Sequence, residues 1–81
     1  MKIRDGLAVN DTGFLFDPTT GESYSLNEMG TVYFNFISEG RNIQEIKSMV
    51  TSEYEVDEPT FEKSFLDFES RLKNLRLIEN E

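Results

Sequence analysis

Residues 14–30, FLFDPTTGESYSLNEMG, contain the change of pattern that decides the fold. Phe14–Phe16 is a short apolar run rich in aromatic residues, and in Glu22–Leu26 apolar and polar side chains alternate with the period of a β-strand. The intervening Asp17–Gly21 combines a proline, which presets its own φ, with a glycine that permits positive φ, so it predicts a tight turn. After the second run, the spacing of apolar residues changes to about 3.6, the period of a helix. The stretch therefore predicts a β-hairpin that leads directly into a helix.

One more strand is predicted before this hairpin. Leu7–Val9 is a short apolar run, and Asn10–Gly13 has the composition of a hairpin turn. Alternation places Phe14 and Phe16 on one face of the second strand. The same alternation in the third strand places Tyr24 and Leu26 on the core side. It places Ser23 and Ser25 on the other face. The end of the chain, residues 79–81, is expected to fray.

Three helices are predicted after the sheet, each from its capping signals. The first begins after Asn27 and stops at Gly40. The second begins after Asn42, where Glu45 three residues later completes a capping box. The third follows an acidic cap and an early proline at residues 57–59 and runs to about residue 75.

Each helix carries an apolar stripe, and these stripes are the candidate core. They are Met29, Val32, Tyr33, Phe36 and Ile37; Ile43, Ile46, Met49, Val50 and Tyr54; and Phe61, Phe65, Phe68, Leu72 and Leu75. Phe34 falls off the first stripe. On the third helix, Leu66 projects to a different side together with Glu62, Glu69 and Lys73, when the residues are plotted at about 100° each. We predict that any function of this helix is carried by that second face.

Length and composition fit one small α+β domain. At 81 residues the chain can build one hydrophobic core but not two, so we expect a single domain over residues 1–81, with its core at residues 3–78. Residues 1–11 contain no apolar run long enough for the core of a signal peptide or for a membrane span, so we predict neither. The absence of cysteine fits a reducing cytoplasm, which is the expected location.

The residues that usually carry chemistry are missing from the sequence. With neither histidine nor cysteine, the chain has no imidazole base, no thiolate nucleophile and no thiolate zinc site. The serines have no base to activate them, the glycines form no phosphate-binding run, and the acidic pairs do not follow the spacing of a calcium loop. We therefore expect no enzymatic activity, no metal and no cofactor.

The charge balance narrows the class of partner. Eight basic and sixteen acidic residues give a net charge of −8, which repels phosphate backbones and anionic lipid surfaces. Neither nucleic acid nor a membrane is therefore an expected partner, whereas a basic peptide or the positive surface of a protein would be favoured. Four cations lie in or just after the third helix, namely Lys63, Arg71, Lys73 and Arg76. Acidic residues lie among them, so we predict that these cations form exposed ion pairs.

The third strand is a candidate site because it is a possible sheet edge. Glu22–Leu26 has no charged side chain except Glu22 to discourage pairing with another strand. An exposed edge accepts an added peptide strand, which gains affinity from main-chain hydrogen bonds and specificity from pockets beside the edge. The face of the third helix around Leu66 would form a wall of such a pocket. The pattern equally allows the edge to be covered by the protein's own tail or helix.

Several stretches of the sequence resemble the PqqD-like family, also known as the RiPP recognition element. They are Leu26–Gly30, Ser38–Ile46, Val56–Asp57 and Phe65–Ile78, and together with the three strands they extend the resemblance over residues 3–78 in the family's order. The chain departs from the family at two positions. Glu39 stands where members often have Asp, and Arg76 stands where many have Gly before the closing apolar pair.

The resemblance implies a winged-helix-like fold in which a three-stranded antiparallel sheet precedes three helices. It also implies that the domain binds the leader part of a ribosomally made precursor peptide and presents it to a modifying enzyme, often a radical S-adenosylmethionine protein. In the family, the leader adds to the third strand and lies in a cleft beside the third helix. The peptide-binding residues implied here are Glu22, Ser23, Tyr24, Ser25, Leu26, Glu62, Leu66, Glu69 and Lys73.

Two other functions stay open at this point. A winged-helix nucleic-acid-binding domain is one, because the helices between residues 29 and 53 form a helix-turn-helix. Its second helix, however, carries only Lys47 against Glu45 and Glu53, which disfavours insertion into a groove of DNA. The other is a docking subunit of a larger enzyme that binds no peptide. The protein is expected to be a monomer or a weak dimer.

Overall fold

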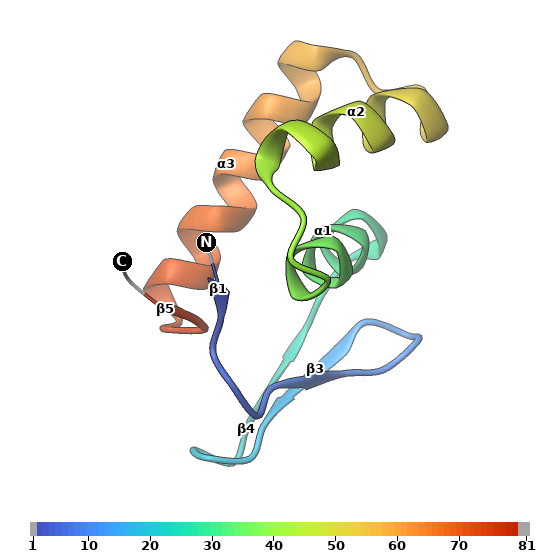
Figure 1. The fold of residues 1–81 in the computed structure, drawn as a ribbon. Helices are drawn as coiled ribbons and strands as arrows, with labels where there is room; N and C mark the ends of the chain where they lie inside the picture. Colours follow the sequence, from blue (N-terminus) through green and yellow to red (C-terminus); the bar gives the residue numbers. More distant parts are fainter. Residues whose placement is uncertain (1, 80–81) are drawn as a thin grey trace.

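The three-stranded sheet forms where the sequence pattern predicts it. In the computed structural model, which describes residues 2–79, β2 (Ala8–Val9), β3 (Phe14–Asp17) and β4 (Glu22–Ser25) pair antiparallel in the order β2-β3-β4. Leu15 lies opposite Tyr24, and both side chains pack in or against the core. Figure 1 shows this sheet on one side of the molecule with the helices above it, and β4 forms one of its edges.

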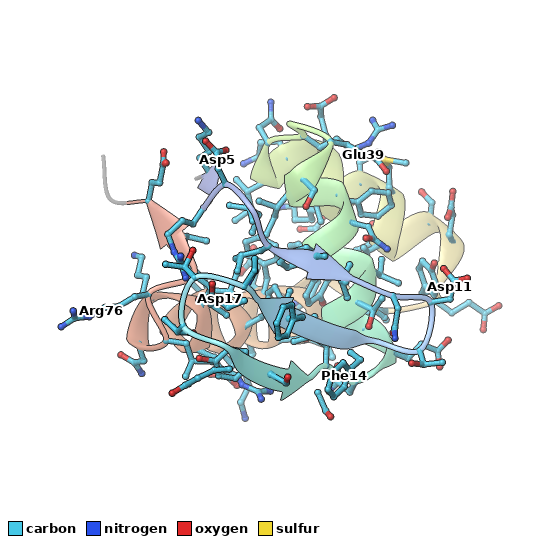
Figure 2. The ribbon with its side chains drawn as sticks, turned by 90° about the horizontal axis from the view of Figure 1, so that it is seen from below. Asp5, Asp11, Phe14, Asp17, Glu39 and Arg76 are labelled. Atoms are coloured by element: carbon cyan, nitrogen blue, oxygen red, sulfur yellow. The ribbon has the colours of Figure 1, made fainter. Side chains whose placement is uncertain are left out.

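The outer face of this sheet is apolar in its centre. Phe14 and Phe16 share that face, as alternation predicts, and their exposed fractions are 46% and 42%. Figure 2, in which the sheet is seen from below, shows Phe14 on the side turned away from the helices. Their cross-strand neighbours on β4 are Ser25 and Ser23, whose small side chains leave both rings open to solvent.

A second sheet joins the two ends of the chain. β1 (Lys2–Ile3) pairs antiparallel with β5 (Ile78–Glu79), and Figure 1 shows the two segments side by side. The expectation of one three-stranded sheet ahead of the helices is therefore wrong in this respect. Glu79 is paired rather than frayed, whereas residues 80–81 lie outside the described part of the chain. Two-residue strands are too short to show alternation, and these partners are far apart in sequence, so no local pattern could reveal the pairing.

The helices begin at the predicted caps. They are α1 (Glu28–Ser38), α2 (Ile43–Glu53) and α3 (Glu58–Asn74). The residue before each helix accepts a hydrogen bond from a main-chain N–H of the first turn, and these residues are Asn27, Asn42 and Asp57. The Asp57 pKa is lowered because its carboxylate accepts hydrogen bonds from Thr60. The Glu45 side chain accepts from the Asn42 N–H in return, which confirms the predicted capping box.

An aromatic cluster holds α1 against α3. The Tyr33 ring of α1 meets Phe61 and Phe65 of α3 edge to face, with ring centroids 5.7 Å and 5.1 Å apart. Phe68 completes the cluster at 5.7 Å from Tyr33. Four of the five residues in the predicted α3 stripe are buried, namely Phe61, Phe65, Phe68 and Leu72, while Leu75 packs half-buried against them.

The buried face of α1 differs from the predicted stripe. Phe34, which the pattern left outside, is only 3% exposed, and Met29, Val32 and Phe36 are half-buried at the margin of the core. Gly30, one helical turn before Phe34, is buried on the same face, so the buried face of α1 extends beyond the predicted stripe. A methyl group at Gly30 would come within 3.2 Å of the Phe68 ring, so the glycine allows α1 and α3 to approach each other. Glycine adds nothing to an apolar stripe, and the pattern therefore missed this contact.

The predicted stripe of α2 is correct only in its middle. Ile46 and Val50 are buried in the core. Ile43 and Tyr54, at the two ends of the stripe, are 47% and 39% exposed. Ile43 is the first residue of α2 and Tyr54 its C-cap, so both lie beyond the part of the helix that the core covers.

Arg4 connects three separated parts of the chain. Its guanidinium forms an ion pair with Asp17, its Nε donates to the carbonyl of Arg76 at 3.0 Å, and its main-chain N–H donates to the carbonyl of Leu77 at 2.9 Å. Asp17 is only 1% exposed although it begins a turn. The hydrogen bond from Arg4 lowers the pKa of this carboxyl, and the Thr19 N–H contributes in the same direction.

The backbone at Arg76 has the conformation that suits the glycine found here in many members of the family. Arg76 has a φ of +58°, in the left-handed region that glycine adopts without steric cost. Arg76 thereby turns the chain at the end of α3 toward β5, and its carbonyl accepts the Arg4 hydrogen bond.

The Arg4–Asp17 pair predicts an acid-sensitive contribution to stability. Asp17→Asn should lower Tm at pH 7, because Arg4 then loses its carboxylate partner. The folded-state pKa of Asp17 is depressed, so its contribution is present above the unfolded value of about 3.9 and disappears as pH falls below it. Thermal unfolding followed by circular dichroism should show the difference in Tm between wild type and Asp17→Asn shrinking below that pH. Asp11→Asn removes the same charge from an exposed turn and should leave Tm nearly unchanged; equal losses in the two variants would contradict the prediction.

The turn at Gly13 gives a second prediction. Gly13 has a φ of +85°, and a methyl group there would lie 2.5 Å from the carbonyl oxygen of Leu26. Gly21 has a similar φ of +78° with open space around it, so Gly21→Ala isolates the conformational cost of about 1–2 kcal/mol. Urea denaturation should show that Gly13→Ala lowers the free energy of unfolding by at least about 2 kcal/mol more than Gly21→Ala does. Equal losses of unfolding free energy in the two variants would mean that the backbone around Leu26 moves to make room for the methyl group at no measurable cost.

Candidate functional site

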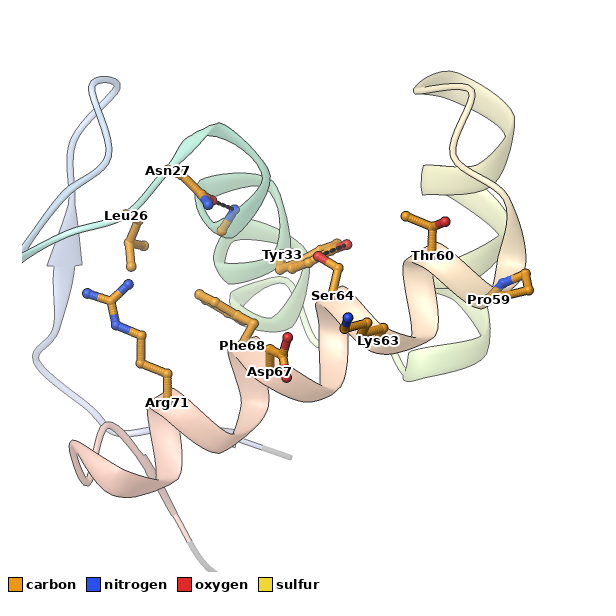
Figure 3. Close-up of a pocket in the computed structure, with 11 residues that line it drawn as sticks. Leu26, Asn27, Tyr33, Pro59, Thr60, Lys63, Ser64, Asp67, Phe68 and Arg71 are labelled. Atoms are coloured by element: carbon orange, nitrogen blue, oxygen red, sulfur yellow. Dashed lines mark hydrogen bonds between the residues drawn. The ribbon is translucent and has the colours of Figure 1, made fainter.

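A groove of about 690 Å³ separates the end of β4 from α3. One wall comes from the junction of β4 with α1, where Leu26, Asn27, Gly30 and Tyr33 line it. The other wall is a face of α3, formed by Pro59, Thr60, Lys63, Ser64, Asp67, Phe68 and Arg71. Figure 3 shows these two walls facing each other, with Tyr33 and Phe68 between them.

The floor of the groove belongs to the core. The rings of Tyr33 and Phe68 pack together there, and the two side chains are 1% and 8% exposed. The Tyr33 hydroxyl donates a hydrogen bond to the Ser64 Oγ at 3.1 Å, as the dashed line in Figure 3 marks. The groove therefore offers an apolar floor with its one hydroxyl pair already satisfied, which suits an apolar side chain of a ligand.

The main chain of β4 offers hydrogen bonds on the groove side. The Leu26 N–H donates to the Gly13 carbonyl at 2.8 Å, so the groups of Tyr24, two residues earlier, also face β3. The alternation of an antiparallel ladder then turns the N–H and C=O groups of Ser23 and Ser25 toward the open edge. The Ser25 carbonyl bears this out, because it accepts a hydrogen bond of 3.4 Å from the Arg71 guanidinium across the groove.

A side-chain hydrogen bond joins Tyr24 and Glu22 at the start of β4. The Tyr24 hydroxyl donates to the Glu22 carboxylate at 2.8 Å, and this hydrogen bond raises the pKa of Tyr24. Tyr24 is half-buried against the core and Leu26 is buried, as predicted for this side of the strand. The side chains of Ser23 and Ser25 are exposed on the other face.

The groove contains cations without acidic partners. Four of the eight basic residues form ion pairs within the described part of the chain, namely Lys2, Arg4, Arg41 and Lys47. The prediction that the third-helix cations would pair with neighbouring acids is wrong for residues 2–79, in which Lys63, Arg71, Lys73 and Arg76 form no ion pair. Two of these, Lys63 and Arg71, line the groove, with Asp67 between them along α3.

The helix residues proposed from the sequence lie on another face of α3. Plotted at about 100° per residue, Glu62, Leu66, Glu69 and Lys73 point about 150° away from the groove-lining row. Leu66 is 56% exposed, and Glu62 forms an ion pair with Lys47 of α2 at 3.6 Å. The structure therefore brings Leu26 to the groove and the Ser25 carbonyl within reach of its Arg71, but leaves these four residues outside it. Their role in peptide binding stays a prediction.

The sequence contained a signal for the groove face that the apolar pattern hid. Thr60, Lys63, Ser64, Asp67 and Arg71 recur at the three-and-four spacing of one helix face, yet the row is polar and of mixed charge. Such a row is typical of a solvated surface. Only the position of β4 opposite to it distinguishes this face from the one that contains Leu66.

The described residues offer no further ligand-binding cluster of the usual kind. Within residues 2–79, no three carboxylate side chains lie close enough together to hold a metal ion. None of the helices in this range has the length and apolar character needed to cross a membrane.

Comparison with known proteins identifies the family of the chain. Residues 12–78 match the family model of coenzyme PQQ synthesis protein D, PqqD. The chain belongs to the PqqD family. Among solved structures, it resembles a chain described as TbiB1 in complex with the TbiA(beta) leader peptide, with 33% sequence identity and a TM-score of 0.86. The match covers 100% of this chain and 98% of that chain. A search of curated proteins gave no match.

Proposed function

We propose that this protein captures the leader segment of a ribosomally synthesised precursor peptide and presents it to a modifying enzyme. The observation that carries the proposal is the open edge of β4 beside a groove of about 690 Å³ walled by α3. Membership of the PqqD family and the likeness to a chain solved with a leader peptide support it. The domain itself performs no chemistry on this proposal, and the modifying enzyme is of the radical S-adenosylmethionine type.

Binding occurs by strand addition in this proposal. The leader pairs with the N–H and C=O groups of Ser23 and Ser25, which extends the sheet by one strand. Alternate leader side chains then point into the groove, since side chains on a strand alternate between the two faces. One of them rests on the apolar floor formed by Tyr33 and Phe68. Glu22–Leu26 is thus the part of the predicted site on which the proposal depends most.

Nucleic acid is the weaker alternative, and no contact in the described residues favours it. The one cation of the second helix, Lys47, is engaged by Glu58 at 3.7 Å and by Glu62 at 3.6 Å. A helix that reads DNA needs free basic and amide side chains. The net charge of −8 opposes binding to a phosphate backbone as well.

The direct test is a titration of isotope-labelled protein with the leader peptide encoded beside this gene. Chemical shifts should change in residues 22–26 and along the groove face of α3, and the protein should bind as a monomer or weak dimer. Changes confined to another surface would mean that the domain docks on an enzyme without holding the peptide at this site. No binding of the leader would reject the proposal.

Main-chain pairing predicts a specific effect of proline on β4. Ser23→Pro removes an N–H that faces the open edge and leaves the ladder to β3 intact, because edge strands tolerate proline at such positions. Calorimetry should show the leader binding at least about tenfold more weakly, which corresponds to about 1.4 kcal/mol. Ser23→Ala alters only the side chain and should change affinity less than about twofold. Equal behaviour of the two variants would argue against strand addition.

The two faces of α3 predict different effects of substitution. Leu66→Glu should fold like the wild type, since Leu66 is 56% exposed, and it tests the face that the sequence pattern favoured. Ser64→Gln places a longer neutral side chain in the groove and can still accept the Tyr33 hydrogen bond. Binding in the groove predicts at least about tenfold weaker leader affinity for Ser64→Gln and less than about threefold for Leu66→Glu. The reverse order, with both proteins folded, would assign the leader to the Leu66 face.

A further inference from the structure

The groove has an electrostatic character opposite to that of the whole protein. Acidic residues outnumber basic ones two to one, sixteen against eight. Nevertheless, Lys63 and Arg71 face the groove without an acidic partner among the described residues, and Asp67 is the one carboxylate that lines it. In a chain with such an excess of acids, unpaired cations in a groove indicate that the groove's ligand supplies the missing negative charge.

We propose that the peptide segment held in this groove is acidic and presents a carboxylate to Arg71. This inference rests on the proposed function and specifies the peptide class that the site selects. It also reverses the expectation from net charge alone, which favours a basic peptide. At ordinary salt concentrations, dissolved ions screen the interaction of exposed charges beyond about 8–10 Å. The nearby cations, and not the net charge of the protein, therefore decide which peptide charge the groove prefers.

The contact between Arg71 and β4 gives the proposal its mechanism. The Arg71 guanidinium lies 3.4 Å from the Ser25 carbonyl, at the long limit of a hydrogen bond. An added strand needs that same carbonyl as acceptor for one of its own N–H groups. A peptide carboxylate takes over the guanidinium in a charge-assisted, bidentate arrangement and thereby frees the Ser25 carbonyl. Figure 3 shows Arg71 extending from α3 toward Leu26, where such a carboxylate would lie.

The spacing of charges along α3 predicts a spacing in the peptide. Lys63 and Arg71 are eight residues apart on one helix, which is about 12 Å at 1.5 Å per residue. An extended peptide covers that distance in about four residues at 3.3 Å each, and residues an even number apart face the same side. The groove therefore favours two acidic residues four positions apart, with a residue that is not acidic midway between them, opposite Asp67.

Charge variants of the protein test the proposal, with the leader segment encoded beside this gene as the probe. Arg71→Glu should weaken leader binding at least about tenfold, and Arg71→Gln should give an intermediate loss. Arg76→Glu makes the same change in net charge outside the groove and should change affinity less than about threefold. Circular dichroism establishes that each variant is folded.

Salt and a charge swap separate the local effect from the global one. Wild-type affinity for the leader should fall between about 0.05 M and 0.5 M salt, because salt screens the attraction in the groove. Repulsion by the net charge of −8 would produce the opposite trend for an acidic peptide. A leader whose groove-facing acidic residue is changed to lysine should bind Arg71→Glu more tightly than it binds the wild type.

The possible outcomes distinguish the two proposals. If the leader binds at β4 but Arg71→Glu and Arg76→Glu behave alike, the acidic-peptide proposal is wrong and the capture function stands. The same conclusion follows if the leader binds more tightly at high salt. If the wild-type protein does not bind the leader at all, the proposed function fails and the acidic-peptide proposal fails with it.

Discussion

The packing of Tyr33 against the phenylalanines of α3 is the contact on which the rest of the structure depends. Three ring centroids lie within 5.7 Å of the Tyr33 ring, and the Phe61 and Phe65 rings meet it edge to face. Each such aromatic pair adds about 0.5–1.5 kcal/mol to what burial alone contributes. Because these contacts fix how α1 lies against α3, they also fix the width of the groove. The Tyr33 hydroxyl, bonded to Ser64, marks the place where the core becomes the groove floor.

The position of β4 depends on a second set of contacts at the opposite end of the hairpin. The buried Asp17 ends β3, and its ion pair with Arg4 ties the hairpin to the segment between β1 and β2. Arg4 also bonds the carbonyls of Arg76 and Leu77, so the end of α3 is held to the same point. Arg4, through its side chain and its main-chain N–H, thus anchors both the hairpin that contains β4 and the end of α3, which forms one wall of the groove. Loss of that anchor would change the groove as well as the stability of the fold.

Local signals in the sequence were sufficient for the three helices and the three-stranded sheet, but not for the terminal strands or for how the elements assemble. The caps at Asn27, Asn42 and Asp57 and the turn at residues 17–21 are local chemistry, and the structure confirms them. The pairing of β1 with β5 joins the two ends of the chain and leaves no local trace. The close approach of Phe68 to Gly30 and the burial of Phe34 on the same face of α1 are not registered by a count of apolar residues. The groove-lining face of α3 was equally out of reach, because one must know where β4 lies to tell a groove wall from a solvated surface.

If the open edge of β4 binds a peptide, it must still avoid pairing with other copies of the same protein. β4 is only four residues long, which leaves a second folded domain a short edge to pair with. A single extended peptide needs only a few such main-chain groups. The hydrogen bond from Arg71 to the Ser25 carbonyl adds a weak guard of the edge, and the net charge of −8 makes two copies repel each other. On the two proposals, the acidic surface and the cations of the groove have separate roles: the surface keeps copies of the domain apart, and the cations select the peptide segment that binds.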